Sequence, residues 1–190
     1  MAIRGEGGRP VRERESEQAR MRDSYAARYE RWTAPLRARP GAVQWLRRAN
    51  ETLKWLFYGA YGLLLVFAAW QSPGKAVALL IVTALGFAVV SIARARLDAP
   101  RPRTACGLDP LVEREGAGCS FPSRHVFSAF AIASSWLSVS GAVAAVLAVC
   151  AGVLGWCRVL GGVHFPRDVI AGVLAGIATG LVACGLALGV

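Results

Sequence analysis

The chain has 190 residues, the length of one domain, but 55% of them are hydrophobic and only 18% are charged, which excludes an ordinary soluble domain and a wholly disordered chain. It carries 22 Lys and Arg against 12 Asp and Glu, a formal net charge of +10. In a soluble protein this balance would suggest nucleic acid binding. Here, however, residues 1–54 hold thirteen of the basic residues, and the remainder contains uncharged runs long enough to cross a bilayer. The basic charge is therefore interpreted as that of a membrane protein, and no nucleic acid partner is expected.

Residues 1–53 are expected to form a polar, basic N-terminal extension, and residues 54–190 a membrane domain. Val11–Trp32 has few apolar positions and fits either a polar surface helix or a mobile segment, and no catalytic role is expected for residues 1–40. Gln44–Lys54 combines apolar residues with paired arginines, which fits a helix lying on anionic headgroups. A solvated linker is equally consistent with that segment.

Four apolar runs follow in chain order: Trp55–Trp70, Ala76–Ala93, Val126–Cys157 and Val169–Val190. The third has 32 residues, too many for one span, and the segment 138–141 near its middle is a plausible turn, so we divide it into two short helices. Both halves are rich in small residues and are expected to pack against protein more than lipid. The sequence thus predicts an all-α polytopic membrane bundle of about five transmembrane helices.

Five spans place the N-terminal extension and the loops 94–124 and 158–168 on one side of the membrane. Lys and Arg then divide 21 to one between the two sides. By the positive-inside rule, we expect an integral plasma-membrane protein whose N-terminus and arginine-rich loops are cytoplasmic. Cys106 and Cys119 share the loop 94–124 and would be able to pair if that loop faced an oxidising compartment.

Both histidines of the chain, His125 and His164, lie at the ends of predicted spans in loops rich in arginine, which indicates an anionic substrate group. Arg94, Arg101 and Arg158 each adjoin the end of a span. A guanidinium group suits phosphate because its planar fork donates several hydrogen bonds and cannot lose its charge. Three such groups are able to hold one phosphoryl group.

Two predicted helix starts add polar groups to these loops. Ser123 is expected to be the N-cap of the third run, so that free backbone N–H groups and the positive helix end point toward the site, with His125 in the first turn. Asp168 follows His164 by four residues, so its carboxylate can reach the imidazole, fix the tautomer and raise the basicity of the other nitrogen. A favourable negative charge at a helix N-terminus would account for Asp168 equally well.

Three separated segments, 94–102, 122–125 and 157–168, together resemble the tripartite signature of the type-2 phosphatidic acid phosphatase superfamily. They read Arg94, six residues, Arg101-Pro102; then Pro122-Ser123-Arg124-His125; then Cys157-Arg158, five residues, His164, three residues, Asp168. The family pattern has Lys at the position of Arg94, Gly at that of Arg124 and Ser at that of Cys157. All three segments occur in order with the family's internal gaps.

The resemblance implies a membrane phosphatase that acts without metal or cofactor through a phosphohistidine intermediate. It implies that His164 attacks phosphorus, Asp168 orients it and His125 protonates the leaving oxygen. The residues implied for the phosphoryl oxygens are Arg94, Arg101, Ser123 and Arg158, and we expect Arg124 to add a phosphate or diphosphate contact. The expected substrate is a membrane lipid phosphate or diphosphate, for which polyprenyl diphosphate, phosphatidate and phosphatidylglycerophosphate all fit.

Two other functions and a second role for the last span also fit the sequence. Because Arg124 and Cys157 depart from the family pattern, the chain would also fit a catalytically impaired membrane protein that only binds phosphate. A vanadate-dependent haloperoxidase-like enzyme is a further alternative within the same superfamily. Gly172, Gly176 and Gly180 form a small-residue face on the last span, which fits either close packing inside the bundle or a homodimer contact.

Overall fold

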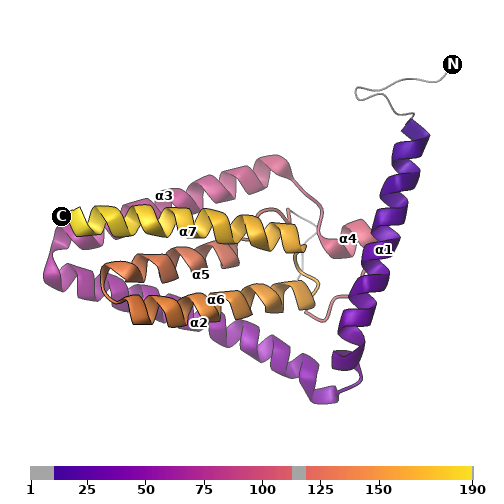
Figure 1. Ribbon diagram of the computed structural model, residues 1–190, viewed down its shortest axis with the longest axis horizontal. Coiled ribbons are helices and arrows are strands. Elements are labelled where there is room, and N and C mark those ends of the chain that lie inside the picture. Colours follow the sequence, from indigo (N-terminus) through magenta and orange to yellow (C-terminus); the bar gives the residue numbers. More distant parts are fainter. Residues whose placement is uncertain (1–10, 113–118, 190) are drawn as a thin grey trace.

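The computed structural model describes residues 11–112 and 119–189, and within these ranges the chain is helical and has no strand. The elements are α1 (Val11–Arg37), α2 (Pro40–Gln71), α3 (Pro73–Leu97), α4 (Pro102–Cys106), α5 (Arg124–Ser135), the short 3-10 helix η1 (Trp136–Ser138), α6 (Gly141–Leu160) and α7 (Pro166–Gly189). Helices α2, α3, α5, α6 and α7 lie side by side in an elongated bundle, and α1 crosses one end of it at a steep angle (Figure 1). The predicted all-α membrane bundle is confirmed.

Four helices are long and apolar enough to cross a membrane: α2, α3 taken through to residue 106, α6 and α7. Helix α5 has 12 residues, about 18 Å, and η1 extends it to about 24 Å, which is less than the hydrocarbon core. The predicted division of the third apolar run is thus confirmed. Its first half is a short helix enclosed by the others, so the expected five spans are four long helices and one short one.

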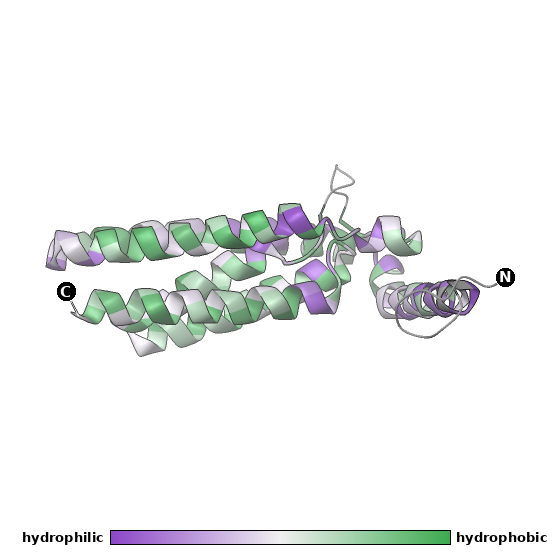
Figure 2. Cartoon of the chain, turned by 90° about the horizontal axis from the view of Figure 1, so that it is seen from above, coloured by the Kyte–Doolittle hydropathy of each residue, from purple (hydrophilic) through white to green (hydrophobic). Residues whose placement is uncertain are grey.

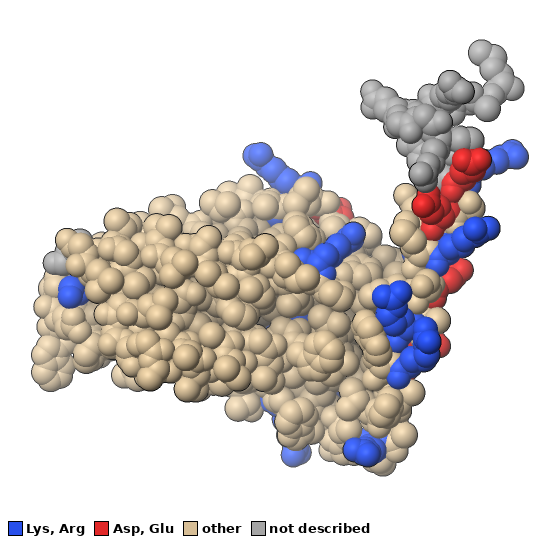
Figure 3. All heavy atoms as spheres, viewed as in Figure 1, with Lys and Arg blue, Asp and Glu red and all other residues tan. Residues whose placement is uncertain are grey.

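The charged residues gather at one end of the bundle. Hydrophilic residues colour α1 and the bundle end beside it, whereas apolar residues colour the length of the bundle (Figure 2). The space-filling view shows charged side chains mainly over α1 and the neighbouring bundle end (Figure 3). The ends of α3, α6 and the starts of α5 and α7 meet there, which is the end predicted to carry the arginine-rich loops.

The N-terminal extension is largely helical. Helix α1 continues five residues beyond the expected Val11–Trp32, to Arg37. The boundary expected after residue 53 falls inside α2, which runs unbroken from Pro40 to Gln71, so the segment 44–54 is the first part of the helix that forms the first span. At 1.5 Å per residue, α2 is about 48 Å long and must extend beyond the hydrocarbon core. The first ten residues lie outside the described ranges.

The centre of the bundle is the contact between α5 and α7. Gly172, Gly176 and Gly180 are buried on α7 and let its backbone approach α5 closely. A Cβ added at Gly176 would lie 2.5 Å from the carbonyl oxygen of Phe127, and one at Gly180 equally close to that of Ala131. The expected close packing inside the bundle is therefore present. The alternative expectation was a homodimer contact through this glycine face. In the structure, α5 of the same chain packs against that face.

We predict that Gly176→Ala destabilises the protein, because the added methyl group meets backbone atoms that cannot rotate away. Overpacking of this kind costs about 1–3 kcal/mol in the free energy of unfolding. The matched control is Gly185→Ala on the same helix, where an added Cβ meets no atom within 4 Å. Thermal unfolding of the two detergent-purified variants tests the prediction, and equal unfolding temperatures would contradict it.

Candidate active site

The candidate site residues come from four helix ends at the polar end of the bundle. Arg94 lies in the last turn of α3 and Arg158 in that of α6, whereas Ser123 immediately precedes α5 and Asp168 lies in the first turn of α7. All four are buried, and a buried charge is tolerated only where partners surround it. Arg101, at the start of α4, is half-buried. The fold thus brings three motif segments distant in sequence to one end of the bundle.

Asp168 and His164 form a buried pair that a third residue joins. Nδ1 of His164 lies 3.6 Å from Oδ2 of Asp168 and 3.3 Å from Oγ of Ser120, and the Ser120 hydroxyl donates to the same Oδ2. Because the single hydroxyl proton of Ser120 is donated to the carboxylate, its Oγ is left to accept from Nδ1–H. The backbone N–H of Phe165 also donates to Oδ2, at 2.9 Å. This network places the imidazole proton on Nδ1 and a lone pair on Nε2.

Ser120 was not predicted as a site residue. It is fully buried and contacts both members of the pair, although the sequence gives it neither charge nor a fixed spacing to His164. Its position two residues before Pro122, the first residue of the second motif segment, is the one signal that pointed to it. A serine that orients another side chain can be identified only from its hydrogen-bond partners, and those partners are known only once the fold is known.

Two arginines lie close to the pair and hold its loops. Nη1 of Arg94 donates to the carbonyl oxygens of Ser120 and Pro122, both at 2.9 Å. The carbonyl oxygen of Arg158 accepts from the backbone N–H of His164, at 3.4 Å. Arg94 therefore fixes the loop that carries Ser120 as well as bringing positive charge to the site.

Ser123 takes the predicted N-cap position of α5, but its side chain makes no capping hydrogen bond. Its Oγ is buried and has no hydrogen-bond partner in the described structure, while its backbone N–H donates to the carbonyl oxygen of Asp168 at 3.0 Å. The first intrahelical bond of α5 runs from Phe127 N–H to Ser123 O, so the N–H groups of residues 124–126 precede it. A buried hydroxyl without a partner costs about 1–3 kcal/mol. This one is placed to bind a ligand oxygen beside a helix N-terminus.

His125 and Arg124 begin α5 but line a separate pocket of about 310 Å³ between α2, α3 and α5. The residues around His164 are not among its lining residues. The guanidinium carbon of Arg124 lies 5.8 Å from the centroid of the Phe87 ring on α3. The side chain of Arg124, for which a phosphate contact was expected, therefore lies in the pocket of His125, and the His164 pair does not line that pocket.

Burial lowers the pKa of His164 to about 4 from its ordinary 6.5, because the desolvated ring resists a charge. The hydrogen bond and negative charge of Asp168 oppose this effect, while the positive charges of Arg158 and Arg94 reinforce it. The basicity that Asp168 was expected to add is thus outweighed by burial. The imidazole is neutral at neutral pH, which a nucleophile requires.

The lowered pKa predicts that acid destabilises the protein through His164. The unfolded chain binds a proton near pH 6.5 and the folded one only near pH 4, so the contribution to stability is present above pH 6.5 and is lost as the pH falls. Between about pH 7.5 and pH 5 the loss amounts to about 2 kcal/mol. Thermal unfolding of wild type and His164→Asn at both pH values measures it. If the two proteins lose equal stability between these pH values, the pKa of His164 is not lowered in the folded protein.

Helix α1 packs against the loop that carries His164. The buried Tyr29 hydroxyl donates to the carbonyl oxygen of Leu160, at 3.0 Å, and accepts from the backbone N–H of Leu111, at 3.3 Å. Gly162 has a left-handed φ of 71°, and an added Cβ would lie 2.7 Å from the Tyr29 oxygen, so glycine is required there for conformation and for space. The polar N-terminal helix therefore supports the site from outside the bundle.

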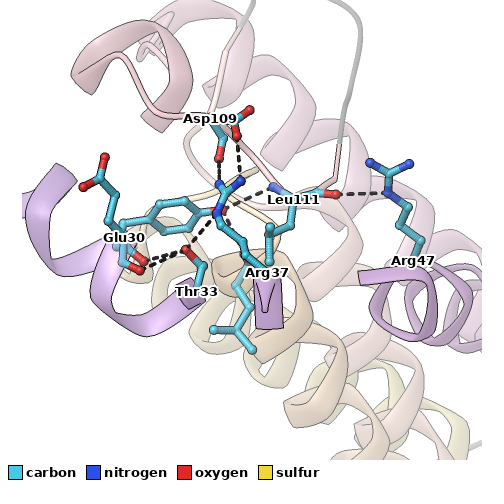
Figure 4. Close-up of polar contacts among 8 residues, drawn as sticks. Glu30, Thr33, Arg37, Arg47, Asp109 and Leu111 are labelled. Atoms are coloured by element: carbon cyan, nitrogen blue, oxygen red, sulfur yellow. Dashed lines mark hydrogen bonds and ion pairs between the residues drawn. The ribbon is translucent and has the colours of Figure 1, made fainter. Parts of the chain in front are cut away.

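Further polar contacts join the N-terminal segment to the loop 107–112 (Figure 4). Arg37 of α1 forms an ion pair of 2.6 Å with the Asp109 carboxylate and also donates to the Asp109 carbonyl. Arg47 of α2 donates to the carbonyl oxygen of Leu111, at 3.0 Å. No catalytic role was expected for residues 1–40, and none of these contacts supplies one. They give the extension a positioning role that the sequence did not indicate.

Comparison with known proteins relates this geometry to a family. The family model described as PAP2 superfamily matches residues 75–187, more than half of the chain and all three motif segments. The chain belongs to the PAP2 superfamily. The resemblance inferred from the motif segments is confirmed, and no curated protein matches this PAP2 chain.

Two solved structures are similar to this PAP2 protein. LpxE of Aquifex aeolicus is 29% identical with a TM-score of 0.52, and the match covers 74% of this chain and 92% of that one. A transmembrane PAP2 type phosphatidylglycerolphosphate phosphatase from Bacillus subtilis is 17% identical with a TM-score of 0.64, and the match covers 90% and 84%. At that identity the second structure supports the fold alone. The four apolar helices and the membrane relative identify an integral membrane protein.

Proposed function

We propose that this PAP2 protein is a membrane phosphatase that hydrolyses a phosphoester or phosphoanhydride bond of a lipid. The observation that carries the proposal is the buried network of His164, Asp168 and Ser120 beside Arg94 and Arg158. A neutral imidazole with a fixed tautomer is a competent nucleophile, and the two permanent cations stabilise the charge on a phosphoryl group as it is transferred. The PAP2 family to which the chain belongs supports the same reaction class.

In the proposed reaction, Nε2 of His164 forms a bond to phosphorus while the bond from phosphorus to the leaving oxygen breaks. His125 gives its proton to that oxygen, and the alcohol or phosphate departs. Asp168 and Ser120 hold Nδ1–H and stabilise the positive charge that the ring gains. Water then attacks phosphorus and gives a proton to His125, the N–P bond breaks, and inorganic phosphate leaves. No step in this proposal uses a metal or a cofactor.

The phosphoryl oxygens are proposed to bind Arg94, Arg101, Arg158 and the hydroxyl of Ser123, together with the first N–H groups of α5. The unpartnered buried Oγ of Ser123 and the helix N-terminus beside it support this assignment. Cys157, in place of the family's serine, is buried and supplies at most a weak donor. We therefore expect lower activity than with serine there, without loss of the reaction.

A lipid substrate is supported by the position of the pocket beside His125 near the headgroup level of the bilayer. Trp55 is 66% exposed on α2, as expected for a side chain at the headgroup level of a bilayer. Its neighbour Lys54 lines the same pocket as His125. A lipid headgroup would therefore reach the site while its hydrocarbon chains remain in the membrane.

A panel of lipid substrates tests the proposed function. Purified protein is incubated with phosphatidate, phosphatidylglycerophosphate and a polyprenyl diphosphate, and released inorganic phosphate is measured. Release from at least one of them is expected. No release from any of them would overturn the enzyme and favour the phosphate-binding alternative, whereas halide oxidation dependent on added vanadate would favour the haloperoxidase-like one.

We also propose that the site faces the cytoplasm at the plasma membrane, on the strength of the charge asymmetry between the two ends of the bundle. All five cysteines are free thiols, and Cys119 is a partly exposed one at the polar end. A variant that keeps only Cys119 is predicted to resist an impermeant thiol reagent in intact cells and to react after permeabilisation. Ready labelling of intact cells would reverse the orientation.

A further inference from the structure

The pocket beside His125 has both cationic and apolar lining residues. Lys54 of α2 and Arg124 of α5 line it together with His125, and the other lining residues are mostly apolar or aromatic. No carboxylate is among these lining residues, although Lys54 also pairs with Glu51 on its own helix. The pocket therefore presents positive charge next to the group proposed to protonate the leaving oxygen.

Arg124 is held in this pocket by an aromatic contact. Its guanidinium group lies over the Phe87 ring, a cation–π contact that holds the charge beside α3. The family pattern has glycine at this position, so the side chain is an addition relative to that pattern. Arg124 directly precedes His125 in the first turn of α5 and lines the same pocket, so its charge lies beside that histidine.

A second, apolar pocket of about 250 Å³ adjoins the first between α2 and α3. The two share four lining residues: Tyr58, Phe87, Ser128 and Ile132. The second continues to Leu80 and Thr83, in the membrane-spanning part of α3. The pocket beside His125 thus carries two cationic side chains and adjoins an apolar space, the two kinds of surroundings that a lipid with a charged linkage requires.

We propose that the pocket of Lys54 and Arg124 binds a second anionic group of the substrate, located between the scissile phosphate and the hydrocarbon chain. The inference rests on the proposed function, in which whatever His125 releases must lie beyond His125. The substrates that fit are lipids whose leaving group itself carries a phosphate, as in a polyprenyl diphosphate or a phosphatidylglycerophosphate. Phosphatidate, whose leaving group is a neutral diacylglycerol, belongs outside this class.

The test compares kcat/KM for phosphatidate with kcat/KM for the two substrates whose leaving groups are anionic. Wild type is expected to prefer at least one anionic leaving group by about 10-fold or more, the size of a charged hydrogen bond. Arg124→Gln, and separately Lys54→Gln, are expected to reduce that preference by about 10-fold, mainly through KM. Arg124→Lys, which keeps the charge without the planar fork, is expected to restore part of it.

The matched control is Arg96→Gln, which removes an exposed arginine at the end of α3 and is expected to leave the preference unchanged. Equal losses on all three substrates in the Arg124 and Lys54 variants, or no preference in wild type, would overturn the second anion site while leaving the phosphatase intact. Failure of wild type on every substrate would overturn the proposed function instead. Comparison of the diphosphate with the phosphatidylglycerophosphate identifies which spacing of the two phosphates fits.

Discussion

His164→Asn is expected to reduce phosphate release from every lipid phosphate by about 10⁴-fold or more, the loss that follows removal of a nucleophile in other covalent hydrolases. The asparagine amide can take the place of Nδ1 toward Ser120 and Asp168, so the buried network keeps a donor. It has no atom equivalent to Nε2, so no bond to phosphorus can form. The loss is therefore expected in kcat, with the folded structure retained.

Thermal unfolding at neutral pH and gel filtration in detergent provide the control for folding, and His164→Ala provides a second variant without the buried amide. Wild type incubated with a labelled lipid phosphate and quenched in alkali is expected to carry protein-bound label, because a phosphoramidate survives alkali better than acid. The asparagine variant is expected to carry none. Turnover at the wild-type rate in either variant would show that another group attacks phosphorus.

The membrane bundle was predictable because bilayer thickness and hydrophobic run length are both readable from sequence. The 32-residue run was correctly divided, since no single helix of that length fits one crossing and the segment 138–141 supplies a turn. The enclosure of α5 by the other helices was harder to predict. Its 12 residues are enclosed by neighbours, and the glycines of α7 that admit it show their function only once the two helices are paired.

Part of the candidate site was predictable because phosphate chemistry limits the usable residue types. Arg94, Arg158, Ser123, His164 and Asp168 converge as expected, since the helix ends that carry them meet at one end of the bundle. Polar side chains near a span end are few in so apolar a chain, which made these residues stand out from the rest.

The remaining site features depend on contacts that sequence spacing does not encode. Ser120 binds the carboxylate of Asp168 across 48 residues, and Tyr29 reaches Leu160 across 131. Tyr25 and Tyr29, four residues apart on a polar helix, were a detectable sign of a face that packs, because aromatic residues at that spacing share one side of a helix. The direction in which Arg124 turns followed from the position of Phe87, which no local rule supplies.

His125→Gln is expected to slow phosphoryl transfer from phosphatidate to the protein by about 10²–10⁴-fold, the usual contribution of a general acid, while slowing the first-turnover release of nitrophenolate from an aryl phosphate far less. The leaving alcohol of phosphatidate is a poor anion and needs the proton, whereas a nitrophenolate leaves without one. With the aryl substrate the first step therefore proceeds, and hydrolysis of the phosphohistidine becomes limiting because His125 no longer receives the proton of water. Label bound to the protein is expected to rise above the wild-type level.

His164→Asn is the matched comparison for this experiment, because loss of the nucleophile must affect both substrates equally and leave no bound label. The ratio of the two first-turnover rates thus separates an acid on the leaving oxygen from a residue that only shapes the pocket, since a purely structural defect would lower both rates in parallel. Parallel loss in His125→Gln would therefore remove the leaving-group role. It would also remove the reason for placing the second anion site beside this histidine. That site binds the leaving group only if His125 protonates the leaving oxygen.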